Sequence, residues 1–373
     1  MSNIRRIGIV LAVLALVAVV MASFKGSDVL ERAIIIGVGI DKSDNGLTLT
    51  AEVVSPGNGQ EQVGTFSKTV TVDAETVGQA IQNVAEQTGK EASLGQCVVL
   101  VLGQKLYETV DFTAVIDYFI NHHSFKESAV ICCCEGEAKD LFNNSDALSQ
   151  SVSLSVAAML LDEAKKIGVA TNSLLQYARS QQELDCTGVV NKIAFVKSEN
   201  KDAHDPDKTQ GYFTYRELAV FRRNTFVCNL NEQEVAGMSL FLDKTEGDSF
   251  VAEQDGTKLT VQVNNKNIKQ SVNGDEFEIT ITLSVRLART DSEEVTGAIT
   301  AKKDKEIDKK VLQSVQEQAL KLAELFVAKQ AEYNFDLIKL HEAVRQKEGT
   351  SSALAAKPTS DFTVNLKIEV KEN

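Results

Sequence analysis

The chain opens with a long unbroken apolar run, from Ile7 to Ala22, which follows two arginines. Extended to Phe24, this run would form a helix about 27 Å long at ~1.5 Å per residue, close to the ~30 Å hydrocarbon core of a bilayer. The arginines favour a cytoplasmic N-terminus, with the remaining chain on the outer side. A small residue at position 22 also suits signal-peptide cleavage. We therefore predict that residues 1–24 are an N-terminal membrane anchor or signal segment.

Residues 31–145 alternate short apolar runs with stretches of helical periodicity. Their order predicts β-β-α-β-α-β-α, which is typical of an α/β domain with a mixed sheet. In the first helix, Val77, Ile81 and Val84 would share the buried face, and Asp73 would cap the N-terminus. In chain order the segments are ERAIIIGVGID, LTLTAEVV, TVDAETVGQAIQNVAEQTGK, QCVVLVLG, DFTAVIDYFINHH, SAVICCCEG and EAKDLFNN.

Residues 146–242 form a predicted middle domain. A longer helical pattern over 146–168 would link it to the first domain, and strands are expected over 191–198 and 217–230. The polar residues between these strands indicate an exposed loop.

Residues 243–373 are predicted to form a strand-rich C-terminal domain with one long helix. Asn273-Gly274 and Asp255-Gly256 mark turns between its strands. In chain order the expected elements are strands over 250–265 and 267–289, a helix over roughly 303–333, its continuation or a second helix over 335–347, and a strand over 361–370. The pattern as a whole predicts a three-domain mixed-sheet protein of the α/β (α+β) class, behind one N-terminal transmembrane or signal helix.

The composition shows that the chain after the N-terminal segment is strongly acidic. The chain has 373 residues, of which 43% are hydrophobic and 24% charged, as in ordinary globular proteins. The formal net charge is −13, and Arg5 and Arg6 are the only charges before Lys25, so the rest of the chain is two charges more negative. The negative charge of nucleic acid would repel such an acidic protein, so no nucleic-acid partner is expected.

The six cysteines predict neither a zinc ribbon nor a redox motif, because none are spaced as CxxC. Cys132, Cys133 and Cys134 lie in an apolar run and are interpreted as small core residues. A chain of this length can build its own core, so a disulfide framework is not expected. The oxidation state of the three consecutive cysteines is left open.

Catalytic and cofactor-binding motifs do not appear in the required context. GVGID begins like a dinucleotide-binding motif, but Lys42 replaces the third glycine and a strand follows where a helix is needed. The glycines are better explained by close packing. His122 and His123 would point about 100° apart on a helix and could not bind one metal ion.

Paired acids offer no better candidate for catalysis. Glu232/Glu234 and Glu276/Glu278 are interpreted as sharing a strand face in solvent rather than as a glycosidase pair. No nucleophile, base and orienting group come together. We predict a non-enzyme without catalytic, cofactor-binding or metal-binding residues.

Several blocks together resemble the Ger(x)C family, the C subunits of spore germinant receptors, over almost the whole exported chain. The blocks are AIIIGVGIDKSDNGLTLTAEVVSP, the strand–helix–strand segment from VVLVLGQKL to EAKDLF, ELAVFRRNTFVCNLNEQEVAGMSLFL, and AEYNFDLIKL with its Tyr-x-x-Asp signature. The family-motif residues, all expected to be structural, are Gly37, Gly39, Asp41, Leu230, Asn231, Glu234, Gly237, Tyr333 and Asp336.

The resemblance implies a non-catalytic, three-domain protein on the outer face of the spore inner membrane. It would act with two polytopic membrane subunits, and the complex would respond to small nutrients by starting ion release and germination. Members are normally lipoproteins whose lipid-bearing cysteine follows the apolar leader. Ser23 occupies that position here, and a hydroxyl cannot form the thioether, so a retained helix is favoured over cleavage after Ala22. Lys339 and His341 replace the family's glycines after Asp336.

Two other classes of function are open at the level of the sequence. One is a stand-alone extracytoplasmic protein that binds a small molecule in a pocket between domains. The other is a secreted hydrolase with a site that no motif reveals. Association with a polytopic membrane protein would distinguish the receptor subunit from both of these alternatives. The sequence leaves open the nutrient, the contact surface and the oligomeric state.

Overall fold

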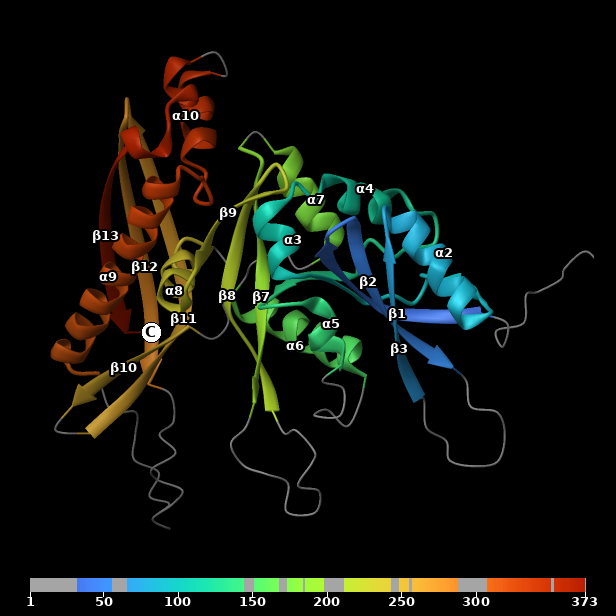
Figure 1. The fold of residues 1–373 in the computed structure, drawn as a ribbon. Coiled ribbons are helices and arrows are strands. Elements are labelled where there is room, and N and C mark those ends of the chain that lie inside the picture. Colours follow the sequence, from blue (N-terminus) through green and yellow to red (C-terminus); the bar gives the residue numbers. More distant parts are fainter. Residues whose placement is uncertain are drawn as a thin grey trace, which may run out of the picture.

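The computed structural model of the chain contains two β-sheets with helices packed on them (Figure 1). It describes residues 32–55, 66–143, 151–167, 173–183, 185–197, 211–242, 248–254, 257–287, 307–349 and 352–372. The predicted membrane anchor or signal segment, with Ser23, lies outside these residues. Among the residues described, none of the helices combines the length and the apolar character needed to span a membrane.

The first lobe, residues 32–230, is built on a nine-stranded mixed sheet in the order β3-β2-β1-β5-β6-β7-β8-β9, with β4 also paired to β1. Its centre is parallel, from β1 through β5 and β6 to β7, and hairpins extend it at both edges. The strands are β1 (Arg32–Ser43), β2 (Gly46–Ser55), β3 (Phe66–Ala74), β4 (Glu91–Ser93), β5 (Val99–Leu102), β6 (Val130–Cys134), β7 (Thr187–Lys197), β8 (Gly211–Arg222) and β9 (Thr225–Leu230).

Helices cover both faces of this sheet, which explains why its two innermost strands, β5 and β6, are apolar throughout. Figure 1 shows α5 and α6 on one face and α2, α4 and α7 on the other. All five residues of β6 are buried, including the three consecutive cysteines, and all six cysteines of the chain are free. The helices are α2 (Val77–Thr88), α3 (Gln104–Thr109), α4 (Thr113–Asn121), α5 (Ala138–Asn143), α6 (Val152–Ile167) and α7 (Leu174–Gln182).

The second lobe, residues 248–372, has a four-stranded sheet in the order β10-β11-β12-β13, in which only β13 is parallel to its neighbour. The long helix α9 packs across this sheet and contacts both edge strands. The elements of the second lobe are β10 (Ser249–Gln254), β11 (Thr257–Asn273), β12 (Glu276–Leu287), α9 (Lys309–Tyr333), α10 (Leu340–Glu348), the 3-10 turns η4 (Ala353–Ala356) and η5 (Thr359–Asp361), and β13 (Thr363–Glu372).

The two lobes are joined by α8 (Glu232–Ser239) and by a shared apolar cluster. Strands β7, β8 and β9 contribute one side of this cluster, and α8, α9 and the residues after α9 contribute the other. Phe326 and Phe335 are its largest members, both almost completely buried. In chain order its buried residues are Val189, Leu218, Val220, Cys228, Leu230, Val235, Met238, Phe326 and Phe335.

The predicted mixed α+β class is confirmed, with differences in several elements. The helix expected after Asp73 begins at Val77 and is capped by Thr76, because Asp73 belongs to strand β3, which the prediction missed. Helices α3 and α7 were also missed. Of the two alternatives predicted for 335–347, a continuation of α9 or a second helix, the structure has the second helix, α10. Glu232 and Glu234, interpreted as a pair on a strand face, lie in the first turn of α8, within residues 231–242, whose pattern also indicates a short helix and turn.

The strands of the predicted middle domain, residues 146–242, extend the sheet of the first domain. Strand β7 pairs directly with β6, and β8 and β9 follow it in the same sheet. Helix α6, expected to link two domains, packs on β1, β5 and β6. The division into three domains stays a prediction.

Candidate functional site at the junction of the lobes

Three family-motif residues, Gly37, Gly39 and Asp41, share one face of β1 because alternate strand residues point the same way. Helices α5 and α6 cross this face closely. A Cβ on Gly39 would lie 2.8 Å from Phe142 Cε2, and one on Gly37 would lie 2.7 Å from the Cβ of Ser153. The glycines therefore let two helices approach the strand, and they form no nucleotide-binding loop.

Asp41 fixes the N-terminus of α5. Its two carboxylate oxygens accept hydrogen bonds from the backbone N–H groups of Ala138 and Lys139, at 2.7 and 3.0 Å. Burial raises the pKa of the Asp41 carboxyl, while the two hydrogen bonds act in the opposite direction. Glu52 acts similarly at α6, where it accepts hydrogen bonds from the N–H and the hydroxyl of Ser153. Both carboxylates position helices.

The second motif block joins β9 to α8. Leu230 is fully buried, and Asn231 caps α8 by accepting hydrogen bonds from the N–H groups of Gln233 and Glu234, both at 3.0 Å. The Glu234 side chain in turn accepts a hydrogen bond from the Asn231 N–H at 2.8 Å, which completes a capping box. A Cβ on Gly237 would collide with the backbone carbonyl of Leu322 on α9. This block therefore sets how α8 crosses α9.

Tyr333 and Asp336 of the third block lie at the end of α9 and have different surroundings. Tyr333 is exposed, with the Lys329 ammonium 4.6 Å from its ring centre. Asp336 is buried and accepts hydrogen bonds from the N–H groups of Leu340 and His341, at 3.0 and 2.8 Å, at the start of α10. Asp336 is the motif residue that reaches the space between the lobes.

An open cavity of about 600 Å³ lies between the lobes beside Asp336. The first lobe contributes the residues before β7 and the turn between β8 and β9, and the second lobe contributes the α9–α10 segment and the end of η4. The lining residues are Asp185, Cys186, Thr187, Arg222, Arg223, Thr225, Asn334, Phe335, Asp336, His341, Ala355, Ala356, Lys357 and Pro358. We take this cavity as the candidate functional site.

Hydrogen bonds from three other segments hold the β8–β9 turn beside the cavity. Arg223 and Asn224 both have positive φ, at 51° and 57°, as a two-residue hairpin turn requires. The Asn224 side chain accepts a hydrogen bond from the Tyr177 hydroxyl and donates one to Thr113, both 2.9 Å long. Across the cavity, Arg222 donates to the carbonyl oxygen of Asn334 at 2.8 Å, which ties the turn to the end of α9.

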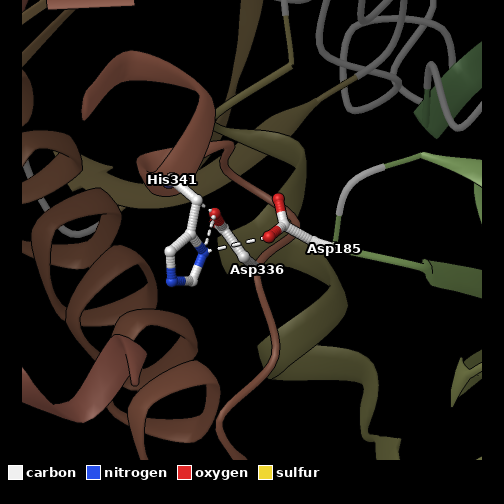
Figure 2. Close-up of side chains that lie close together, drawn as sticks. All are labelled: Asp185, Asp336 and His341. Atoms are coloured by element: carbon white, nitrogen blue, oxygen red, sulfur yellow. Dashed lines mark hydrogen bonds and ion pairs between the residues drawn. The ribbon is translucent and has the colours of Figure 1, made fainter. Parts of the chain in front are cut away.

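His341 lies between acceptors on both of its ring nitrogens. Nε2 is 2.8 Å from the carbonyl oxygen of Lys357, and Nδ1 is 2.9 Å from Asp336 Oδ2. Asp185 of the first lobe places Oδ1 3.3 Å from the same Nδ1. Figure 2 shows the two carboxylates converging on this nitrogen. A carbonyl oxygen can only accept, so Nε2 carries a proton.

Burial, hydrogen bonds and neighbouring charges shift the pKa values of His341 and Asp185. Burial acts to lower the pKa of His341, but the hydrogen bonds to Asp336 and Lys357 and the charges of Asp336 and Asp185 outweigh it, and the pKa is raised. Burial, with the like charge of Asp336, raises the pKa of Asp185, although His341 and Arg345 oppose that shift. The site is therefore a charged contact between the lobes, in which Asp336 and His341 are buried and Asp185 is partly exposed.

Two of the three converging residues escaped the sequence prediction. Asp185 carries no local signal, and His341 was noted as a departure from the family's glycines but was assigned no role in a site. They are far apart in the chain, so only the packing of the lobes brings them together. His122 and His123 stack on each other beyond α4, with ring centres 4.9 Å apart, and lie outside this cavity.

The geometry defines a class of protein: a two-lobed α+β protein whose motif residues hold helices in place and whose lobes meet at a polar cavity. Comparison with known proteins identifies the family. Residues 26–192 match the family described as "Spore germination protein N-terminal domain", and residues 216–373 match "Spore germination B3/ GerAC like, C-terminal". The chain therefore belongs to the Ger(x)C family of spore germination proteins, as the motif residues suggested.

A curated relative and a solved structure agree with this assignment. The chain is 22% identical over 261 residues to "Spore germination protein A3" of Bacillus subtilis (strain 168), an alignment covering 68% of this chain and 66% of that relative. The chain thus spans just under two thirds of the relative's length. It also matches "Crystal Structure of the GerBC protein" with a TM-score of 0.52 and 15% identity, over 90% of this chain and 96% of the other. That match shows a shared fold.

Proposed function

We propose that this protein is a non-catalytic, membrane-tethered subunit of a nutrient germinant receptor that acts with two polytopic membrane subunits. The observation that carries the proposal is that residues 26–192 and 216–373 match, in chain order, the N- and C-terminal families of spore germination proteins. The motif residues support a structural role, because the glycines pack against helices and Asp41, Asn231 and Glu234 serve helix N-termini.

Deletion in the spore-forming host tests the receptor role. Spores lacking the chain should lose ion release triggered by the nutrients that this receptor detects, while their heat resistance and their response to other triggers stay normal. Complementation with the intact gene should restore the response. Unimpaired germination in every nutrient would refute the proposal.

Co-purification tests the assembly. The full chain, extracted from spore membranes with detergent, should carry two polytopic proteins with it. The cavity between the lobes supports one alternative, a stand-alone protein that binds a small molecule there, because its size suits such a ligand. Purification without any polytopic partner would favour that alternative.

The tether rests on the apolar run and on Ser23 in place of the family's lipid-bearing cysteine. Mass spectrometry of the native protein should find the N-terminal segment with Arg5 and Arg6 intact, as a retained helix requires. A chain that begins at Ser23 would instead mean that the leader is cleaved and that the protein is released or held by its partners.

A further inference from the structure

We propose that Asp185, Asp336 and His341 form a binding site for a divalent transition-metal ion that bridges the two lobes. One ligand atom from each residue lies within 4.8 Å of the other two. Asp185 comes from the first lobe and the other two residues come from the second, as Figure 2 shows. The proposal concerns this chain's own residues, and it is independent of the receptor function proposed above.

The distances from His341 Nδ1 to the two carboxylates are close to those between ligands of one ion. Atoms bound to Zn²⁺ at about 2.0–2.2 Å in tetrahedral or octahedral geometry are separated by roughly 3.0–3.5 Å. His341 Nδ1 lies 2.9 Å from Asp336 Oδ2 and 3.3 Å from Asp185 Oδ1. A small closure of the carboxylates around the ion would complete this part of the coordination shell, and the open cavity would supply water for the remaining positions.

The second ring nitrogen is held as in known metal-binding histidines. Such residues donate a hydrogen bond from the nitrogen that does not bind the metal, often to a backbone carbonyl, and this fixes the tautomer. Nε2 of His341 donates to the carbonyl oxygen of Lys357 at 2.8 Å. The lone pair of neutral His341 therefore lies on Nδ1, which faces both carboxylates. A bound metal ion would replace the proton that Nδ1 otherwise carries there.

The ligand types indicate which metal to use as a probe. An imidazole with two carboxylates suits Zn²⁺ and its first-row neighbours, whereas Ca²⁺ and Mg²⁺ prefer oxygen ligands alone. Two carboxylates also balance the charge of a divalent ion. Asp336 is held by the N–H groups of Leu340 and His341, and the His341 ring packs edge-on against Phe362, so two of the three ligands are already oriented.

Zinc binding to the full chain in detergent, after removal of metal with a chelator, tests the site. Equilibrium dialysis against Zn²⁺ should leave one tightly bound ion per chain, and excess Mg²⁺ or Ca²⁺ should not displace it. Asp185→Asn and His341→Phe should each weaken binding by about tenfold or more. Asp185→Asn keeps the size of a partly exposed loop residue, so it remains informative if His341→Phe fails to fold.

Two matched controls separate this site from others. Cys186→Ser removes a thiol that lines the same cavity, and His123→Gln removes an exposed histidine elsewhere; both should bind zinc like the unaltered chain. With Co²⁺ as the probe, the absorption should lack a thiolate charge-transfer band. The proposal is overturned if no zinc is retained, if Asp185→Asn and a folded His341→Phe both bind normally, or if Cys186→Ser abolishes binding.

Discussion

At the scale of single residues, the glycines show how closely this fold brings its backbone segments together. Gly78 in α2 and Gly237 in α8 both occupy helices, where a glycine normally costs stability relative to alanine. Their surroundings differ. A Cβ on Gly78 would meet only Tyr118 Cε2, at 3.4 Å, whereas one on Gly237 would lie 2.9 Å from Phe326 Cβ and still closer to the Leu322 carbonyl.

Gly237→Ala should therefore lower the free energy of unfolding by about 1–3 kcal/mol, because α8 must move away from α9. Gly78→Ala should raise it by about 0.5–1 kcal/mol through helix propensity alone. Thermal or urea unfolding followed by circular dichroism measures both. Equal effects of the two substitutions would mean that the α8–α9 crossing can relax at little cost.

At the scale of elements, polar side chains decide where several helices begin. Asn231 and Glu234 form one capping box at α8, and Ser173 and Gln176 form another at α7. In both, the side chain of the cap residue accepts a hydrogen bond from a backbone N–H group of the first turn. The side chain three positions later accepts a hydrogen bond from the backbone N–H of the cap residue. The capping box of α8 lies at the junction of the lobes, so its loss should destabilise the junction as well as the helix.

Asn231→Ala should cost about 1–2 kcal/mol of unfolding free energy, since it leaves the N–H groups of Gln233 and Glu234 without their acceptor. Asn231→Asp is the matched control, because it keeps an acceptor oxygen in the same place and should cost much less. Urea unfolding of the two variants gives the comparison. Similar losses would show that the amide, rather than the cap, matters.

Elements with strong periodicity were the predictable part of this fold. The stripe of Val77, Ile81 and Val84 correctly located α2, because its buried face repeats with the helical period. Strand β3 was missed, although its polar and apolar residues alternate as in a strand, because it ends only three residues before α2 and its last residues were assigned to that helix, with Asp73 as the cap. The cavity was beyond prediction, since Asp185 and His341 meet only after both lobes have packed.

At the scale of the whole molecule, the two lobes are coupled by a small apolar cluster and by polar contacts around the cavity. Phe335 is 1% exposed in this cluster, with its ring 6.3 Å from that of Phe326. Close by, Arg222 and Asp185 of the first lobe contact Asn334 and His341 of the second. Each lobe also has a larger core of its own.

Phe335→Ala should therefore separate the unfolding of the two lobes. The cavity left behind costs about 3–5 kcal/mol, and the loss falls on the junction rather than on either main core. Differential scanning calorimetry should show one transition for the unaltered chain and two for the variant. Phe277→Ala, which removes the same side chain from the core of the second lobe, should destabilise that lobe while the junction contacts remain. A single transition in Phe335→Ala would contradict this view.

The parallel pairing of β12 with β13 also constrains the order of assembly during synthesis. All strands of the first sheet precede residue 231, so that sheet can form while later segments are still being made. The second sheet cannot close in this way, because β13 follows α9 and α10 and yet fills the edge beside β12. Until β13 arrives, the backbone of β12 is an unpaired edge open to other chains. The nascent protein thus passes through a stage in which the first sheet can be folded while the second still has an unpaired edge strand. A chaperone that prevents aggregation would matter most at this stage.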